Sequence, residues 1–490
     1  MQRRVLSLAL LACLALALAG CKPQVEGEPR VVVIGGEPRL ADPAAGPLAA
    51  SDAVLLQNVG QGLVSFDASG NIVGGLAERW NVSDDGMSYI FRIASAEWPN
   101  KTKITAQQVA RLLKRQLATR SRNSLKDTLG AVEDVVAMTD RVIEIRLVAP
   151  RPNLLPLLAQ PEFAIVRDGH GTGPFSAGRT GGPNGEIRLS SEVVSPDDEV
   201  TRREEVMLSG APADQAVRAF ADGKLDLVLG GTFADLPFAR AVKLPRNALR
   251  FDPASGLFGL VAARDDGPLK DREVRQLLSQ AVDRDALVAS LNVPGLASRA
   301  SVLEAGLDGM PAPVQPAWLA TPLTDRRPAL LARAQKLSGG KQRPTVRIFL
   351  PDAPGSAILL DRLVADWGAV GFAVERAKTL AEADLRLMDA VAPSSSAAWF
   401  LRNFHCGVIA LCEPQVDQLL DAARTAQVPA QRYALLYDAA LQIDDDQLFI
   451  PLTAPVRWSL VAKRIQGFAG NRYARHTLTD LMQGPNNQGG

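Results

Sequence analysis

Two separated strand–helix–strand units constrain the fold of this chain more than any other feature. The first covers residues 205–229 and the second residues 345–388. Strands are expected at 205–208, 225–229, 345–350, 372–375 and 383–388, with helices at 213–221 and 356–370. Such units pair their strands in parallel through a right-handed crossover, and Gly223 can cap the first helix. Two units far apart in the sequence predict an α/β protein whose two lobes enclose a cleft at the carboxyl ends of the strands.

A β-hairpin is predicted at residues 76–93, which read LAERWNVSDDGMSYIFRI. Apolar Trp80 and Val82 alternate with polar residues before an Asp-Gly turn, and Tyr89 and Phe91 alternate with polar residues after it. Period-2 alternation on both sides of such a turn is typical of a hairpin with one buried face. By itself, this pattern indicates structure rather than function.

The hairpin and its surroundings resemble the entry region of a known family. Before it lies NVGQGLVSFD at 58–67, and after it lies ITAQQV at 104–109. Their order is similar to that in family 5 of the bacterial extracellular solute-binding proteins, which bind oligopeptides, dipeptides or nickel. The sequences GTGPF at 171–175, PLKDREVRQLL at 268–278 and FIPL at 449–452 extend the resemblance over nearly the whole mature chain.

The resemblance implies a two-lobed α/β fold like that of periplasmic binding proteins, with two hinge crossings and an extra inserted subdomain. The crossings are expected at 257–263 and 449–452. Where the family usually has Asn at the end of the first crossing, this chain has Ala262 and Ala263. The expected divisions are a signal peptide at 1–20, a lipidated tether at 21–30, lobe I at 31–50, 165–256 and 453–490, the insertion at 51–164 and lobe II at 257–452.

Further elements are expected within the insertion and lobe II. The insertion should hold a helix at 107–117 and a strand pair at 132–138 and 142–147. In lobe II, a helical face is formed by Val274, Leu277, Leu278 and Ala281, with Asp283 as the cap of the next helix and amphipathic helices at 417–424 and 431–443.

The first 20 residues form a targeting segment. Arg3 and Arg4 precede an apolar run at residues 5–16, which is too short for a stable membrane span. The segment ends in Leu-Ala-Gly directly before Cys21, which resembles a lipobox. We expect Cys21 to be lipidated after cleavage and to hold the protein at the periplasmic side of a bacterial membrane, in the inner or the outer one. An ordinary secretory signal with Cys21 as a bystander is the alternative.

Charge and composition exclude several classes of partner. The 54 basic and 53 acidic residues give a net charge of +1, and loss of Arg3 and Arg4 leaves 52 basic against 53 acidic residues. This balance points neither to nucleic acid nor to an acidic partner. After the signal, no apolar run in the sequence is long enough to span a membrane, so the lipid is the only expected membrane contact.

Two cysteines remain once Cys13 leaves with the signal and Cys21 takes the lipid. Cys406 and Cys412 lie six residues apart in HCGVIALC, which outside the cytoplasm most simply means a local disulfide. A metal site with His405 is the alternative, but no other histidine is near in the sequence. No metal or cofactor is therefore expected.

Six residues are candidate ligand contacts. The resemblance puts Glu37 and Arg39 at the border of the cleft and Phe258 on the first crossing. In lobe II, the family often carries several acids that can meet a peptide's ammonium, and here Asp389 alone stands in that stretch. The structural alternative for Asp389, a solvated loop residue, is the favoured one.

The other two candidates also have structural alternatives. Trp399 can stack on a ligand or pack in the core, and Arg386 can bind a carboxylate or form a surface salt bridge. A peptide is the expected ligand by resemblance, and the three histidines of the chain argue against nickel.

Three classes of function remain. The favoured one is a monomeric solute receptor of an ATP-driven importer, which delivers a small ligand to the permease and its ATPase. The alternative is a lipoprotein of the same fold that acts as a ligand sensor, signalling adaptor or chaperone. An enzyme is not indicated, because the sequence lacks a Gly-x-Ser-x-Gly elbow, a His-Glu-x-x-His motif and a phosphate-binding glycine loop.

The lipid on Cys21 can be tested directly in cells. With a labelled fatty-acid analogue, the wild type should take up label and sediment with membranes, whereas Cys21→Ala should do neither, because the acylated thiol is gone. Cys13→Ala is the matched control and should behave as the wild type. Equal labelling of the Cys21→Ala variant would contradict the lipobox.

Overall fold

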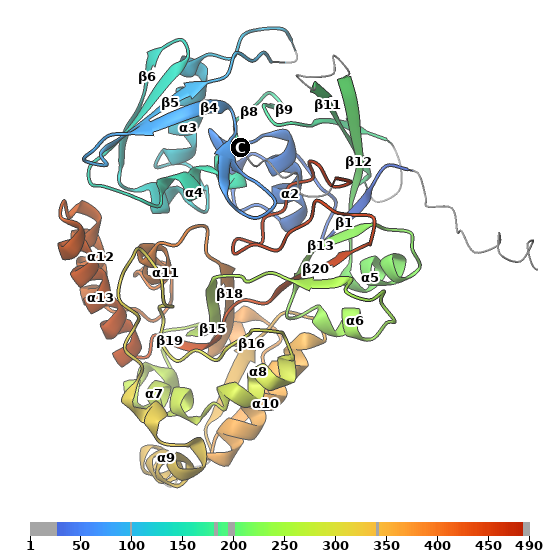
Figure 1. The fold of residues 1–490 in the computed structure, drawn as a ribbon. Helices are drawn as coiled ribbons and strands as arrows, with labels where there is room; N and C mark the ends of the chain where they lie inside the picture. The colour runs from blue at the N-terminus through green and yellow to red at the C-terminus, as the bar shows by residue number, and fades with distance from the viewer. Residues whose placement is uncertain (1–26, 99, 181–184, 195–200, 340–342, 484–490) are drawn as a thin grey trace, which may run out of the picture.

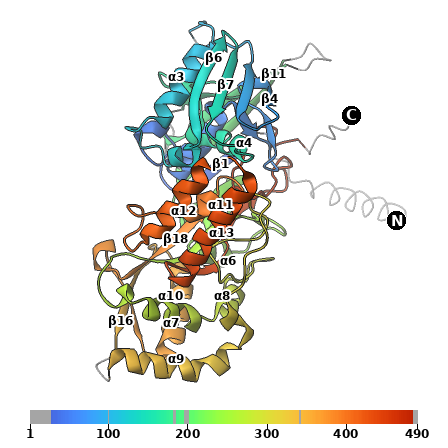
Figure 2. The same cartoon turned by 90° about the vertical axis from the view of Figure 1, so that its left-hand side faces the viewer.

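Two lobes and an inserted subdomain make up the molecule (Figure 1). The computed structural model describes residues 27–98, 100–180, 185–194, 201–339 and 343–483 of the 490-residue chain. The signal segment and Cys21 lie outside the described residues. Seen from the side, the inserted subdomain lies at one end of an elongated molecule and helix α9 (Leu323–Ser338) at the other (Figure 2).

Lobe I is built on a seven-stranded sheet with the order β10-β11-β12-β1-β13-β20-β14. Helix α5 (Ala213–Ala221) joins β12 to β13, as the first strand–helix–strand unit predicts, and Gly223 follows it with φ +74°. The strand β1 lies between β12 and β13 and is parallel to both. The strands are β1 (Arg30–Ile34), β10 (Ser176–Arg179), β11 (Ile187–Val194), β12 (Thr201–Ala211), β13 (Leu227–Thr232), β14 (Leu249–Phe251) and β20 (Arg457–Val461), with α2 (Ala50–Val59) and α6 (Leu236–Arg240).

The inserted subdomain contains the predicted hairpin as β4 and β5 of a four-stranded sheet, in the order β4-β5-β7-β6. Trp80 pairs with Phe91 and Val82 with Tyr89, but only the β5 partners are fully buried. Helix α3 begins with a capping box in which the Thr105 side chain accepts from the Gln108 N–H. The bounds are β4 (Ala77–Val82), β5 (Ser88–Ile93), α3 (Ala106–Leu117), β6 (Val132–Thr139) and β7 (Val142–Leu147), with shorter β2 (Val64–Phe66), β3 (Ile72–Gly74), α4 (Leu154–Leu158), β8 (Val166–Arg167) and β9 (His170–Gly171).

Lobe II has a five-stranded sheet in the order β17-β16-β18-β15-β19. The second predicted unit is present, with β16 parallel to both β17 and β18. As expected, the Asp283 side chain accepts from the Ala286 N–H at 2.9 Å and caps α8. The bounds are β15 (Gly256–Ala262), α7 (Arg272–Ala281), α8 (Arg284–Leu291), β16 (Thr345–Phe349), α10 (Gly355–Ala369), β17 (Ala373–Arg376), β18 (Leu385–Val391), α11 (Ala397–Arg402), α12 (Pro414–Thr425), α13 (Pro429–Asp445) and β19 (Phe449–Thr453).

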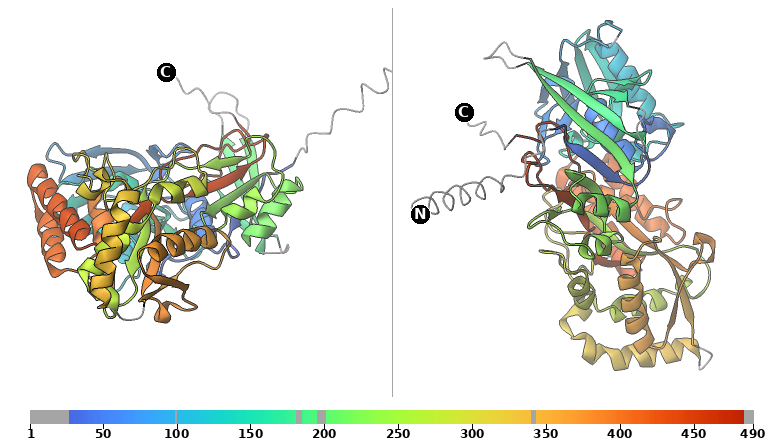
Figure 3. Two further views of the ribbon diagram at one scale, coloured as in Figure 1. Left: turned by 90° about the horizontal axis from the view of Figure 1, so that it is seen from below. Right: turned by 90° about the vertical axis from the view of Figure 1, so that its right-hand side faces the viewer.

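The chain passes between the two sheets twice within the described residues. Residues 252–255 connect β14 of lobe I to β15 of lobe II, and residues 454–456 connect β19 of lobe II to β20 of lobe I. The segments predicted as crossings, 257–263 and 449–452, are therefore mainly paired strands of lobe II, and each crossing is the short connection beside its strand. Both connections join the sheet of lobe I to the sheet of lobe II, and Figure 3 shows the molecule from below and from its right-hand side.

Side chains also join the lobes away from the crossings. Phe258 of β15 packs edge-to-face on Phe233 of lobe I, with ring centroids 4.9 Å apart. From the inserted subdomain, the Gln160 side chain donates to the Pro393 carbonyl at 2.8 Å, and the Asn153 amide donates to Asp308. Lobe II therefore contacts both lobe I and the inserted subdomain across the cleft.

Cys406 and Cys412 are bonded to one another in the structure, with Cα atoms 5.2 Å apart. They lie in the connection between α11 and α12. The redox state of the pair in the cell remains a prediction.

Asp444, near the end of α13, gives lobe II a pH-dependent stability. Burial raises its pKa to about 7, although its Oδ1 accepts a hydrogen bond from the Val302 N–H at 2.9 Å. In the unfolded chain the pKa is near 3.9. Between about pH 4 and pH 7 the folded protein therefore binds more protons than the unfolded chain, and the free energy of unfolding falls as pH rises.

Asp444→Asn should remove this dependence, because the amide keeps an acceptor for Val302 and carries no charge. We expect the variant to match the wild type near pH 4 and to exceed it at pH 8 by up to about 4 kcal/mol, at 1.36 kcal/mol per pKa unit. Urea unfolding at the two pH values measures this, with Asp438→Asn, at an exposed acid on the same helix, as control. A variant less stable than the wild type at pH 8 would contradict the assignment.

Candidate ligand-binding site

A cavity of about 450 Å³ lies between the lobes at the carboxyl ends of β1 and β13. Sheets of this kind bind ligands at that edge, where strand ends and loops leave space. Lobe I, lobe II and the inserted subdomain all contribute to its walls. The lining includes Val33, Gly230, Thr232, Asp252, Arg457, Trp458, Ser459, Arg475 and His476 from lobe I, Asp389, Val391 and Trp399 from lobe II, and Leu125, Gln160 and Glu162 from the inserted subdomain.

An ion pair crosses the hinge at this cavity. Arg457, the first residue of β20, donates from Nη1 to Oδ1 of Asp389 on β18 at 2.8 Å, and each side chain is 15% exposed. Burial raises the pKa of Asp389, and the guanidinium of Arg457 opposes that rise. In the part of the chain that the structure describes, no hydrogen bond reaches Oδ2 of Asp389. That oxygen is available to a ligand donor.

Two further acids of the cavity have cationic or ionisable partners. The Arg475 guanidinium lies 3.3 Å from Oε1 of Glu162. The His476 Nε2 lies 3.3 Å from Oδ2 of Asp252, and both side chains are almost fully buried. All three acids of the lining therefore have a partner, and the cavity has no large excess of one sign of charge.

Several polar atoms of the lining residues make no hydrogen bond with the described residues. They are Nε2 of Gln57, Oε2 of Glu162, Oγ of Ser459 and Nδ1 of His476. Buried polar atoms are nearly always paired with protein or water, so such a group of unpaired atoms is unusual. These atoms are almost inaccessible from the cavity, so they are not ligand contacts in this arrangement.

Two of the six predicted ligand contacts line this cavity. They are Asp389 and Trp399, both from lobe II. Trp399 is only 9% exposed and packs edge-to-face on Phe400, with centroids 5.1 Å apart, so most of its ring belongs to the core.

The other four predicted contacts lie outside the lining. Glu37 and Arg39 are exposed, and the Arg39 N–H donates to the Asp52 side chain. Phe258 is buried in the core that joins the lobes. Arg386 on β18 is half-buried, and burial lowers its pKa.

The cavity also contains charged residues that the sequence analysis missed. Arg457 follows the second crossing directly and is the one charged residue between 449 and 461, so a lone charge in an apolar stretch was a usable signal. No comparable signal marked the other three charged residues, because their partners are distant in the sequence; they are Glu162, Arg475 and His476.

Within the described residues, no helix is both long and apolar enough to cross a bilayer. Among the same residues, no cluster of three or more His, Cys, Asp or Glu side chains is arranged to hold a metal ion.

The sequence matches the model of a known protein family. The model of the bacterial extracellular solute-binding proteins, family 5 Middle, matches residues 71–403, roughly two thirds of the sequence. This chain belongs to that family. The family expected from the hairpin and its neighbouring motifs is therefore confirmed.

Relatives and solved structures agree with this family and its two-lobed fold. A probable di/tripeptide-binding protein of Pseudomonas aeruginosa is 24% identical over 480 residues, which cover 85% of this chain and 88% of the relative. The OppA structure from Burkholderia pseudomallei has a TM-score of 0.78 at 17% identity and covers 94% of this chain and 99% of its own. AgaA of A. tumefaciens R10, in complex with agropinic acid, has a TM-score of 0.70 at 20% identity, with 92% and 96% covered.

The hinge ion pair predicts a specific stability defect. Arg457→Gln should lower the free energy of unfolding by about 3 kcal/mol at pH 8, because it leaves the Asp389 carboxylate buried without its counter-charge. The loss of the guanidinium raises the pKa of Asp389 further, so the loss of stability should shrink as the pH falls, because protonation removes the buried unpaired charge.

Adding Asp389→Asn to Arg457→Gln should restore much of the lost stability, since no unpaired charge remains. Urea unfolding of the single and double variants measures the coupling. Arg203→Gln removes an exposed ion pair with Glu192 and should cost at most about 1 kcal/mol. Equal losses in the single and double variants would contradict a pairwise interaction.

Proposed function

We propose that this protein is the peptide-binding component of an ATP-driven importer, which closes its lobes over a short peptide and delivers it to a permease and its ATPase. The cavity between the lobes carries this proposal. Its volume of about 450 Å³ is within the range of small-ligand sites, and its walls combine apolar surface with a few polar groups. A Pseudomonas aeruginosa relative named as a probable di/tripeptide-binding protein and a Brucella ovis relative named as a putative ABC transporter peptide-binding protein support the transport role.

Binding in this cavity requires no covalent chemistry. Closure of the cleft would exclude water, so a hydrogen bond that Oδ2 of Asp389 accepts from the end of a ligand would be made in a dry environment. The cavity opens at strand ends, where a peptide main chain can also pair with backbone groups and leave side-chain specificity loose. A lipid on Cys21 would hold the protein beside the permease at the periplasmic side of the membrane.

The role of Asp389 gives the proposal its test. Its Oδ1 is held by Arg457, so its Oδ2 can accept from the ammonium of a peptide N-terminus. Asp389→Asn should weaken binding of a free tripeptide by about 1–3 kcal/mol, because a charge-assisted hydrogen bond is lost. The N-acetylated tripeptide should bind both proteins alike, since it has no ammonium.

Titration calorimetry with both peptides and both proteins makes this comparison. Asp352→Asn changes a fully exposed acid of lobe II and serves as the matched control. Equal losses for free and acetylated peptide would remove Asp389 from the ammonium site. Failure of every peptide to bind would redirect the function to a non-peptide solute, as AgaA with agropinic acid illustrates within the same fold.

A further inference from the structure

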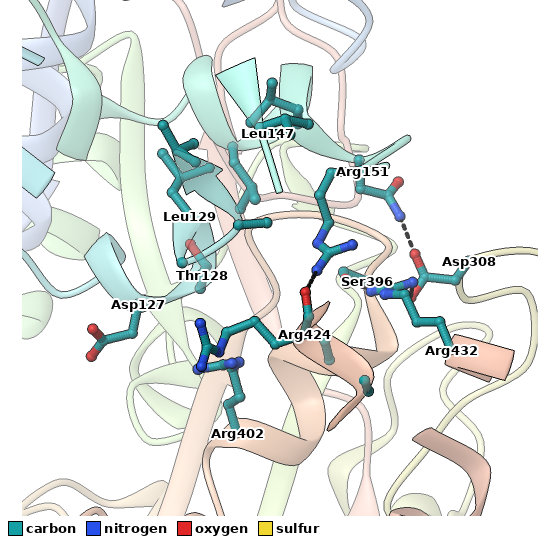
Figure 4. A pocket seen from close by; sticks show the side chains of 18 of the residues that line it. Asp127, Thr128, Leu129, Leu147, Arg151, Asp308, Ser396, Arg402, Arg424 and Arg432 are labelled. Carbon is teal, nitrogen blue, oxygen red and sulfur yellow. Dashed lines mark hydrogen bonds and ion pairs between the residues drawn. The ribbon is translucent and has the colours of Figure 1, made fainter. Parts of the chain in front are cut away.

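A second hollow lies between the inserted subdomain and three helices of lobe II (Figure 4). We call it the arginine pocket, because Arg151, Arg402, Arg424 and Arg432 line it. Its volume is about 40 Å³, room for roughly three water molecules, so it suits a small group rather than a whole peptide. It shares no lining residue with the 450 Å³ cavity described above.

The four arginines come from opposite sides of the cleft. Arg151 follows β7 of the inserted subdomain, whereas Arg402 ends α11, Arg424 lies in the last turn of α12 and Arg432 in the first turn of α13. The Arg151 guanidinium donates to the backbone carbonyls of Pro150 and Arg424 (Figure 4). The pocket therefore has one wall in the inserted subdomain and the other in lobe II, and the two walls approach each other when the cleft closes.

The positive charges of these guanidinium groups lower the pKa values of their neighbours. Burial, with the nearby charges of Arg432 and Arg402, lowers the pKa of Arg151 to about 10. Burial and Arg424 also lower the pKa of Arg402. Arginine side chains carry a positive charge at neutral pH, so the repulsion among the four opposes closure unless negative charge offsets it.

The carboxylates of the lining do not balance this charge. Asp308 is fully buried, lies 3.5 Å from Arg432 and also accepts from the Ala397 N–H. Asp127, the other acid of the lining, is exposed. Arg424 also has an acid beside it, because Oδ1 of Asp421 lies 3.6 Å from its Nε.

The half-buried side chain of Arg402 makes no hydrogen bond or ion pair with any residue that the structure describes. Four cations thus face three acids.

We propose that the arginine pocket binds a small anion, of the phosphate or dicarboxylate type, and that this anion holds the inserted subdomain against lobe II. A negative charge offsets the excess of positive charge over the three acids, and guanidinium groups suit the paired oxygens of carboxylates and phosphates. Because Arg151 and the other three arginines lie on opposite sides of the cleft, closure brings them together, so the anion binds the closed form better and shifts the protein toward it. This site is separate from the proposed peptide site and does not depend on the ligand bound there.

Calorimetry with inorganic phosphate tests the site, using the full mature chain in a chloride buffer of low ionic strength. We expect the wild type to bind phosphate and Arg402→Gln to bind it at least tenfold more weakly. Arg402→Lys keeps the charge without the forked geometry of the guanidinium, so its affinity for phosphate should lie between those of the wild type and Arg402→Gln. Arg376→Gln, which changes an exposed arginine of lobe II outside the pocket, should bind as the wild type.

A parallel titration with succinate identifies the preferred class of anion. Tight binding of phosphate or succinate to the wild type, with weaker binding to Arg402→Gln, supports the site. The melting temperature of each variant in chloride confirms that it is folded, and Arg402→Lys carries the test if the glutamine variant does not fold. The proposal fails if the wild type binds neither anion. It also fails if Arg376→Gln weakens binding as much as Arg402→Gln does, because the effect would then be one of overall charge.

Discussion

The structure depends on strands that lie in one sheet and continue, within three or four residues, into the other. β19 pairs with β15 in lobe II, and after residues 454–456 the chain pairs as β20 between β13 and β14 in lobe I. The connection at 252–255 leads in the opposite direction, from β14 of lobe I to β15 of lobe II. Connections this short tie the lobes at one edge, so relative motion must open the opposite edge, where the inserted subdomain meets helices α11 to α13.

Charge is arranged differently at the two ends of that cleft. At the hinge, Asp389 and Arg457 neutralise each other across the lobes, so the cavity can close without a charged ligand. At the opening edge, the arginines outnumber the acids, and closure brings like charges together. A ligand at the hinge and an anion at the edge would therefore favour the same closed form by different physical means, the first by hydrogen bonding and burial and the second by relieving repulsion.

Local patterns predicted the elements well because their causes are local. The hairpin at 76–93, the capped helix α3 and the Asp283 cap follow from side chains a few residues apart. The order of strands was harder, since nothing in the sequence of β12 and β13 shows that β1 lies between them. The charged pairs of the site were also out of reach, because Arg457 lies 68 residues from Asp389 and Arg475 lies 313 from Glu162.

The position of β20 has a consequence for the order in which the sheets can form. Lobe II and the inserted subdomain each form their sheet from one continuous stretch, so both can fold before synthesis of the chain is complete. The sheet of lobe I cannot, because β13 keeps an unpaired edge until residues 457–461 arrive, more than 200 residues later. During that interval an open, apolar strand edge is exposed to neighbouring chains, which makes the last thirty or so residues decisive for yield as well as for shape.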